Sequence, residues 1–450
     1  MFYPLATDYL VWLLIAAVAG FAFYSARKPH LAAPWARVFR SRAAVASSVF
    51  LAVFVAIGLL DSVHYRPQLP AQEAGAPAVY AVEVRSLLDV VLAPLRTRLE
   101  KTYSAPLATR LYQKESVELP GGKVVREFPR LAHGGAHLKD ESRWGGDVAL
   151  RVLGGLAGAI ALWSVAVLAA RRTVVRRWPA VAWGAAAAAL GALLAVAGPV
   201  ALLAAGYHVF GTNQVGSDVL YQALKSIRTS LVIGTLTTLV LLPAGIAAGI
   251  AAGYFKGWVD DLIQYVYTTL NSIPGVLLIA ASVLMVQVYV DTHPELFPTA
   301  AQRADFRLLS LCVILGALGW TGLARLLRGE ALKLSELEYI QAAHAFGVSH
   351  ARILGRHILP NVAHIVIISL VLDFSGLVLA EAVLSYVGVG VDPSTISFGT
   401  MINSARMEMA REPMVWWSLA AAFVFMFALV LAANLFADAV RDGFDPRVRV

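Results

Sequence analysis

Long apolar stretches recur along this chain, and they constrain its fold more than any other feature. Each is about twenty residues long, which is the length that a helix needs to cross the hydrocarbon core of a bilayer. The composition agrees, because 58% of the 450 residues are hydrophobic and only 15% are charged, whereas soluble domains are about half apolar and a quarter charged. We therefore expect an all-α, polytopic transmembrane helical bundle of about nine spans, at residues 9–26, 43–61, 150–170, 180–206, 228–254, 264–290, 307–327, 361–387 and 415–438.

The basic residues predict how these spans are oriented, because short loops rich in Arg and Lys face the cytoplasm. Three basic segments fall on one side when the spans alternate: 27–42, 171–178 and 325–356. The C-terminus falls on that cytoplasmic side too, and Met1–Asp8 on the periplasmic side. The first span lacks a basic segment before it and is long enough to cross, so we expect a retained helix and not a cleaved signal. The net charge of +8 is explained by these loops, so no nucleic-acid partner is expected.

The segment 62–149 lies on the periplasmic side in this topology and mixes charged, apolar, Pro and Gly residues. Helical periodicity in Leu87–Leu99 is broken by Pro94, and Val117–Phe128 predicts a hairpin around Pro120–Gly122. We expect a small ordered insertion of mixed structure. The predicted organisation is two N-terminal transmembrane helices (1–61), the periplasmic insertion (62–149), two additional transmembrane helices (150–206) and a core (207–450).

Sequence signatures of catalysis are absent. The chain has no G-x-x-x-x-G-K-[ST] phosphate loop, no H-E-x-x-H and no G-x-S-x-G, and its one cysteine is Cys312, within an apolar stretch. We therefore expect no catalytic residue, no metal site and no cofactor in this chain. Two alternative functions are those of a membrane-embedded enzyme and of an ion-pathway subunit. The enzyme would need a nucleophile and base, or metal ligands, at one membrane depth. The ion-pathway subunit would need several intramembrane carboxylates.

The loop 328–360 between two spans has the pattern of an amphipathic helix that includes Leu334. Gly347 is placed to end that helix in a left-handed conformation. Ser349 can cap a second short helix, which we expect Pro360 to end. On physical grounds alone, the loop predicts either an interfacial helix or a docking element.

The same loop resembles a known motif. Gln341-Ala342-Ala343, then Gly347, then Ile358-Leu359-Pro360 is similar to the E-A-A-x-x-x-G-x(9)-I-x-L-P loop of ATP-binding-cassette importer permeases. Gly347 and Pro360 keep the spacing of that motif. Gln341 departs from it where a Glu is usual, and His357 departs from it at the first Ile.

Three further segments resemble the oligopeptide/dipeptide/nickel branch of that family, and specifically its C-type inner-membrane subunit. They are Gly211–Asp218 (similar to G-T-D-x-x-G-R-D), Ala380–Met401 (similar to A-E-x-x-L-S-F-L-G-L-G-x-x-P…W-G-x-M) and Arg441–Arg447 (similar to R-D-x-x-D-P-R). The resemblance covers about residues 207–450, and span 43–61 resembles the first helix of the family.

The resemblance implies a transmembrane permease subunit that carries peptides or similar small solutes by alternating access in the bacterial inner membrane. It implies a heterodimer with a homologous permease subunit, two ATPase subunits that use the ATP, a periplasmic solute-binding protein and membrane lipid. It also implies that loop 328–360 couples the permease to the ATPases, through Tyr339, Gln341, Ala342, Ala343, Phe346, Gly347, Arg352, His357 and Pro360.

A few residues inside the spans are candidates for the pathway or its gate. Asp373 and Glu381 are intramembrane carboxylates, which are costly in lipid and therefore candidates for function. The sequence leaves two roles for Asp373, lining the path or a structural contact. For Glu381 it favours a structural hydrogen bond. Asn271 and Pro274 interrupt a span, as a gate or as a simple kink. Small residues four apart predict a helix-packing seam at Gly245, Gly249 and Gly253.

Overall fold

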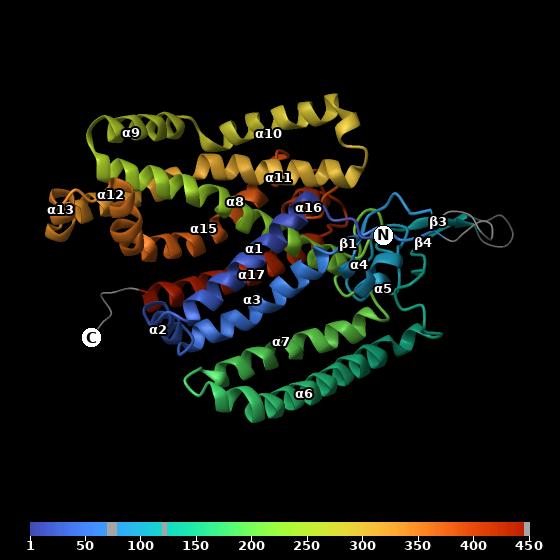
Figure 1. Ribbon diagram of the computed structural model, residues 1–450. Coiled ribbons are helices and arrows are strands. Elements are labelled where there is room, and N and C mark those ends of the chain that lie inside the picture. Colours follow the sequence, from blue (N-terminus) through green and yellow to red (C-terminus); the bar gives the residue numbers. More distant parts are fainter. Residues whose placement is uncertain (70–78, 119–123, 445–450) are drawn as a thin grey trace. The chain divides into compact units, whose positions relative to one another are not determined.

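The computed structural model describes residues 1–69, 79–118 and 124–444, and most of them are helical (Figure 1). The α-helices are α1 (Ala6–Ala26), α2 (Pro29–Val38), α3 (Arg42–Asp61), α4 (Leu87–Val91), α5 (Ala93–Thr97), α6 (Trp144–Arg177), α7 (Trp183–Ala204), α8 (Val219–Phe255), α9 (Gly257–Ser272), α10 (Gly275–Thr292), α11 (Ala300–Gly319), α12 (Thr321–Ser335), α13 (Glu338–Ala345), α14 (His350–Ile353), α15 (Leu359–Val387), α16 (Phe398–Met409) and α17 (Trp417–Phe444). The strands are β1 (His64–Tyr65), β2 (Arg85–Ser86), β3 (Glu115–Glu118) and β4 (Val124–Glu127).

Nine helical segments of the described residues are long and apolar enough to cross a membrane. They are Ala6–Ala26, Arg42–Asp61, Glu141–Arg177, Trp183–Ala204, Val219–Phe255, Gly275–Thr292, Ala300–Ser335, His350–Val387 and Trp417–Phe444. The prediction of an all-α polytopic bundle with about nine spans is therefore confirmed.

One predicted span has the wrong boundaries. Residues 264–290 are not a single helix, because α9 ends at Ser272 and α10 begins at Gly275. Pro274 has no N–H to continue the helix, and it holds Ile273 in an extended conformation with φ −94° and ψ 134°. The candidate span is α10 alone. The twenty-residue criterion averaged apolar residues across the proline and so merged two helices.

Contacts divide the chain into two compact units, and the chain enters each of them three times. Unit 1 comprises Met1–Pro4, Ala36–Ser230 and Thr395–Phe436. Unit 2 comprises Leu5–Trp35, Leu231–Ser394 and Ala437–Val450. The two units group distant segments by their contacts, whereas the sequence divided the chain into four consecutive segments. That four-segment organisation therefore stays a prediction.

In unit 1, the segment 62–149 has mixed structure. β1 pairs with β2 and β3 with β4, both antiparallel. The predicted helix within Leu87–Leu99 is broken into α4 and α5, with Pro94 in the first turn of α5. The hairpin expected from the sequence is present as β3–β4, while its turn at Pro120–Gly122 lies outside the described residues.

A buried ionic cluster joins this segment to the start of α8. His208 Nδ1 lies 2.7 Å from Asp218 and its Nε2 lies 3.3 Å from Glu100. Burial alone would lower the pKa of His208, but its hydrogen bonds to Asp218 and Glu100 raise it to about 9. Burial alone would raise the pKa of Glu100, but hydrogen bonds from His208 and from the backbone N–H groups of residues 132–134 lower it to about 2. The cluster is therefore charged near neutral pH and ties three segments together.

The segment Gly211–Asp218 packs too closely on the insertion to admit side chains at its glycines. Gly216 has a φ of +73°, and a Cβ there would lie 1.8 Å from the carbonyl oxygen of Glu100. Asp218 also accepts hydrogen bonds from the N–H groups of Leu220 and Tyr221, at 2.8 and 3.3 Å, and thereby caps α8. This motif therefore joins the insertion to the core helix.

In unit 2, the predicted seam is confirmed, because α8 packs closely against α12 along its glycines. A Cβ at Gly245 would lie 2.9 Å from the Leu323 side chain, and a Cβ at Gly249 would lie 2.7 Å from the Ala324 carbonyl oxygen. A Cβ at Gly253 would lie 2.6 Å from the carbonyl oxygen of the residue at 328. Only glycine permits this approach of the two backbones.

Candidate functional site

The loop 328–360 begins on α12 and continues through α13 and α14, both in unit 2. The helix that the sequence predicted to include Leu334 is two helices, because α12 ends at Ser335 and α13 begins at Glu338. A π-helical turn, Leu354–Ile358, then joins α14 to α15.

Three isoleucines anchor the inner side of this loop. Ile340, Ile353 and Ile358 are fully buried. They belong to one hydrophobic cluster together with Tyr254 of α8 and Leu327 of α12. Burying such a side chain contributes about 1.5–3 kcal/mol, so the loop is fixed to the ends of α8 and α12.

The outer side of the loop is exposed. Phe346 is 86% exposed and Tyr339 is 46% exposed. Gln341 and Ala342 are exposed too, whereas Ala343 is half-buried against the hydrophobic cluster. An exposed aromatic ring beside a small residue, on a helix anchored from behind, is a surface suited to docking.

Gly347 forms the turn after α13 and has the left-handed conformation that the sequence predicted, with φ +70°. Its N–H donates to the His344 carbonyl oxygen and the Val348 N–H donates to the Ala343 carbonyl oxygen, each at 3.0 Å. A Cβ at Gly347 would meet nothing within 4 Å. The requirement for glycine there is one of backbone conformation and not of space.

Two expectations about the second helix are wrong. Ser349 occupies the N-cap position of α14, but its side chain accepts no capping hydrogen bond; its carbonyl oxygen accepts from Arg352 and Ile353 at 3.0 and 3.1 Å. Pro360 does not end the helix, because α14 continues through the π turn into α15 and Pro360 lies in the first turn of α15. Proline is tolerated in a first turn, where its missing N–H is not needed.

A tyrosine–histidine cluster that the sequence did not reveal holds both sides of the Gly347 turn. The Tyr254 hydroxyl lies 2.7 Å from His344 Nε2 and 2.9 Å from His350 Nδ1. Tyr254 is about ninety residues away in the sequence, so no local pattern connects it with the loop. The sequence signal that could have indicated this cluster was a tyrosine at the end of one span together with histidines in a later loop.

Gln341 turns toward Glu336 at the end of α12. Its amide donates to the Glu336 carbonyl oxygen at 3.3 Å, and Glu336 forms an ion pair with Lys256. Farther along α12, Arg328 donates two hydrogen bonds of 2.6 Å to Asp260 of α9. The hydrogen bond from Arg328 lowers the pKa of Asp260. These polar contacts fix the base of the loop to α9 and to the end of α8.

The remaining coupling candidates lie on the same side of the loop as α13. The rings of Tyr339 and His357 have centroids 6.0 Å apart, and Asn361 donates to the Tyr339 hydroxyl at 3.3 Å. Arg352 and Pro360 are exposed. The structure therefore brings the coupling candidates together around α13 and the π turn.

The four pathway candidates are not brought together by any contact among the described residues. Asn271 accepts a 3.3 Å hydrogen bond from Thr321, and Pro274 is the N-cap residue of α10. Glu381 is fully buried on α15 and accepts a 2.7 Å hydrogen bond from Ser385. Asp373 is half-buried on the same helix and has no polar partner among the described residues. Its role, in lining the path or in the structure, stays a prediction.

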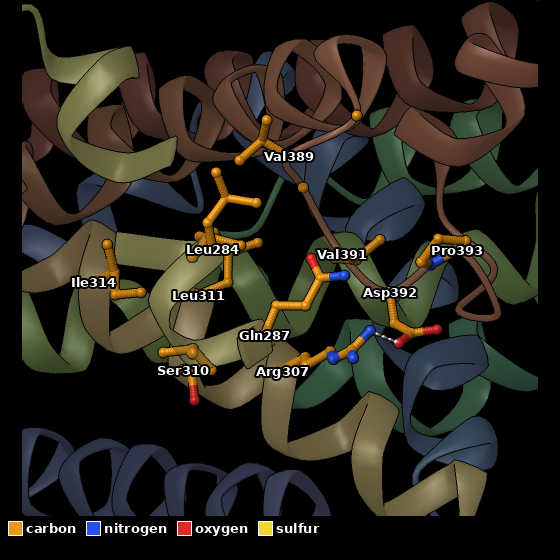
Figure 2. A pocket seen from close by; sticks show the side chains of 14 residues that line it. Leu284, Gln287, Arg307, Ser310, Leu311, Ile314, Val389, Val391, Asp392 and Pro393 are labelled. Atoms are coloured by element: carbon orange, nitrogen blue, oxygen red, sulfur yellow. Dashed lines mark hydrogen bonds and ion pairs between the residues drawn. The ribbon is translucent and has the colours of Figure 1, made fainter. Parts of the chain in front are cut away.

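The segment after α15 lines a small cavity of about 110 Å³ against α10 and α11 (Figure 2). Arg307 of α11 reaches Asp392 at 2.5 Å and Asp291 at 2.7 Å. Burial alone would raise the pKa of Asp392, but hydrogen bonds from Ser394 and the charge of Arg307 lower it. The segment 388–393, with its two glycines, is thus held by an ion pair that the sequence did not predict.

Comparisons with known proteins agree with the resemblance noted in the sequence. The family described as "Binding-protein-dependent transport system inner membrane component" matches residues 245–450. The oligopeptide transport system permease protein OppC of Mycobacterium tuberculosis is 33% identical over 242 residues, which are 54% of this chain and 77% of that protein.

Two other relatives align over a similar part of the chain. The glutathione transport system permease protein GsiD of Pectobacterium atrosepticum is 31% identical, over 54% of this chain and 73% of that protein. The dipeptide transport system permease protein DppC of Lactococcus lactis is 28% identical, over 53% of this chain and 64% of that protein. A chain of the MetNI methionine ABC transporter, solved in inward-facing conformations, is 16% identical with a TM-score of 0.36, over 49% of this chain and 97% of that chain.

Proposed function

Since the chain belongs to the inner-membrane components of binding-protein-dependent transport systems and is a transmembrane permease subunit, we propose that it carries peptides or similar small solutes. Its relatives are named as permeases for oligopeptides, dipeptides and glutathione. We propose further that loop 328–360 couples the chain to separate ATPase subunits. ATP is then used by those subunits and not by this chain, which has no phosphate loop.

The observation that carries the coupling proposal is the two-sided character of α13. Ile340 is fully buried, while Phe346 at the end of the same helix is 86% exposed. A large aromatic side chain held in water by a rigid anchor gains free energy when a partner covers it, by about 25 cal/mol per Å² of apolar surface buried. An aromatic side chain of this kind is a typical binding hot spot.

The proposed assembly also includes a homologous permease subunit, with which this chain forms a heterodimer, and a periplasmic solute-binding protein. Closure of two ATPase subunits around ATP would push on α13 and favour the outward-open state, so that the two helical bundles alternate between two arrangements. The solute would pass Asp373, which has no polar partner among the described residues and is free to bind one. The extra helices α6 and α7 and the segment 62–149 would add contacts outside this core.

The proposed topology puts loop 328–360 and the C-terminus in the cytoplasm and the segment 62–149 in the periplasm. It is supported by the basic segments 27–42 and 171–178, which contain no acidic residue. Coupling to cytoplasmic ATPases requires this orientation.

The test is co-purification with co-expressed ATPase subunits of the same transport system. We expect Phe346→Asp to weaken co-purification about tenfold or more, because the docked interface would bury an unpaired charge. Val215→Asp is the matched control, since Val215 is 69% exposed and lies outside the loop. The purified chain alone should not hydrolyse ATP. Equal co-purification of the two variants would contradict the proposal.

A further inference from the structure

An apolar cavity of about 540 Å³ lies between α3, α6 and α7 in unit 1, outside the part of the chain that matches the family. Its walls include Val53 from α3, Ala170 from α6, and Trp183 and Ala187 from α7. Arg171 is the one charged residue in this lining. The volume falls within the range of about 300–1,000 Å³ that is typical of ligand sites.

α6 and α7 form a helical hairpin (Figure 1), and the cavity lies near the turn that joins them, because its lining on these helices runs from Ala166 to Val175 and from Trp183 to Leu190. A Cβ at Gly155 would lie 2.5 Å from the backbone nitrogen of Pro199. Nearer the cavity, Trp163 Nε1 donates a 2.7 Å hydrogen bond to the Ala187 carbonyl oxygen. The two helices are therefore held together on the side of Gly155, and the space opens toward the turn that joins them.

Two arginine-rich segments meet at this open end. The Ala182 N–H, in the turn between α6 and α7, donates a 3.1 Å hydrogen bond to the Phe39 carbonyl oxygen, just before α3. This contact brings residues 171–177, with four arginines, beside residues 37–42, with three more. Neither segment contains an acidic residue, and no ion pair of these arginines is found among the described residues. The end of the hairpin therefore carries a concentrated positive charge that no ion pair among the described residues neutralises.

We propose that this cavity binds an anionic phospholipid, with an acyl chain between α3, α6 and α7 and the phosphate at Arg171. The apolar lining accounts for the acyl chain, because hydrocarbon can fill an apolar crevice in a membrane without burying an unpaired polar group. The arginines explain the headgroup, because basic pockets between transmembrane helices attract anionic lipid headgroups. Trp178 and Trp183 stand at the same end, where tryptophans mark the boundary between hydrocarbon and water.

The test uses the full chain purified in mild detergent and titrated with phosphatidylglycerol or phosphatidylcholine, with bound lipid counted by native mass spectrometry. We expect one tightly bound phosphatidylglycerol and weaker phosphatidylcholine binding. Arg171→Gln should weaken phosphatidylglycerol binding about fivefold, from the loss of about one basic side chain at the headgroup. Arg172→Gln is the matched control, because Arg172 is exposed and does not line the cavity.

A second pair of variants tests the acyl-chain site. Ala170→Phe narrows the cavity and should weaken tight binding, whereas Ala169→Phe, at an exposed position outside the lining, should not. Fluorescence quenching by phosphatidylglycerol with brominated chains, compared between the unaltered chain and Trp183→Phe, repeats the test without altering α6. Equal binding of the two lipids, an equal effect of the two arginine variants, or a quenched fraction unchanged by Trp183→Phe would overturn the proposal.

Discussion

Gly347 forms the turn between α13 and α14, and its backbone there is left-handed, with a φ of +70°. Gly347→Val should cost about 1–2 kcal/mol at this turn, since a residue with a Cβ is strained in the left-handed region. We expect solute uptake and ATPase co-purification to fall about tenfold at matched membrane abundance.

The control for this substitution is Gly347→Asn. A Cβ at Gly347 meets nothing within 4 Å, so the expected effect of valine comes from backbone conformation and not from contact of its Cβ with neighbouring residues. Asparagine tolerates the left-handed conformation better than valine does. Uptake by Gly347→Asn should therefore stay near that of the unaltered chain. Wild-type uptake and ATPase binding by Gly347→Val would show that this loop is not the coupling element.

His208 makes the stability of unit 1 depend on pH. Because its pKa is raised from 6.5 to about 9, its ionic contribution is fully present below about pH 6.5 and is lost as the pH rises through 9. The pKa of Glu100 is lowered from 4.5 to about 2, so its contribution is lost only as the pH falls toward 2.

We therefore expect the unfolding midpoint of the purified chain to fall between pH 7 and 9, and His208→Gln to remove that slope. The variant should also be less stable at pH 7 by about 3–5 kcal/mol, because it leaves buried carboxylates without their cation. Thermal unfolding followed by circular dichroism at several pH values is the measurement. The same slope in both proteins would mean that His208 is not the titrating group.

At the residue scale, the sequence revealed what a residue type demands locally and missed what the fold brings together. Gly347 could be predicted because a helix followed by glycine has few alternatives. Tyr254, which lies 2.7 Å from His344, could not be, because its partner is far away in the sequence. Ser349 was assigned a cap from its residue type, whereas the structure satisfies the turn with its backbone carbonyl.

Among the elements, the spans could be predicted from length and apolar content, and their ends could not. The sequence indicated an interruption at Pro274, between α9 and α10. Because apolar residues lie on both sides of it, the sequence did not indicate that α10 alone is the span. The short strands β3 and β4 were predicted by turn residues. The helix expected in loop 328–360 was predicted too long, because α12 extends to Ser335 and takes up the first part of the pattern.

The insertion 62–149 should resist proteolysis near its contacts with the core. Arg98 donates hydrogen bonds to the carbonyl oxygens of Ala204 and Ala205, at 3.2 and 2.8 Å, and the Glu100 N–H donates to the Gly216 carbonyl oxygen at 3.0 Å. We expect trypsin to spare the bond after Arg98 in the folded chain. Cleavage should be measured by mass spectrometry of the fragments.

Gly216→Val should expose this bond, because the new side chain would overlap the Glu100 carbonyl oxygen and strain a backbone with φ +73°. Gly145→Val is the matched control, since a Cβ at Gly145 meets nothing within 4 Å. Rapid cleavage after Arg98 in the unaltered chain would show that the insertion does not pack on the core in solution.

For the whole molecule, composition was enough to predict a membrane bundle, but not which segments share a unit. Residues 207–230 and 395–436 belong to unit 1, while the segment between them belongs to unit 2. Such interleaving depends on contacts between distant segments, which periodicity does not encode. The family match begins at residue 245 and does not include the charged end of the α6–α7 hairpin.

The orientation of the whole chain is the last expectation, and it rests on charge. The basic segments 27–42 and 171–178 contain no acidic residue, so translocating either one would cost far more than leaving it in the cytoplasm. Alkaline phosphatase, which is active only in the periplasm, should therefore be active when fused after residue 135 and inactive after residues 175 and 340. Green fluorescent protein fused at the same points should give the reverse pattern. An active phosphatase at residue 340 would place the exposed ring of Phe346 away from every cytoplasmic ATPase, and the coupling proposal would fail with the topology.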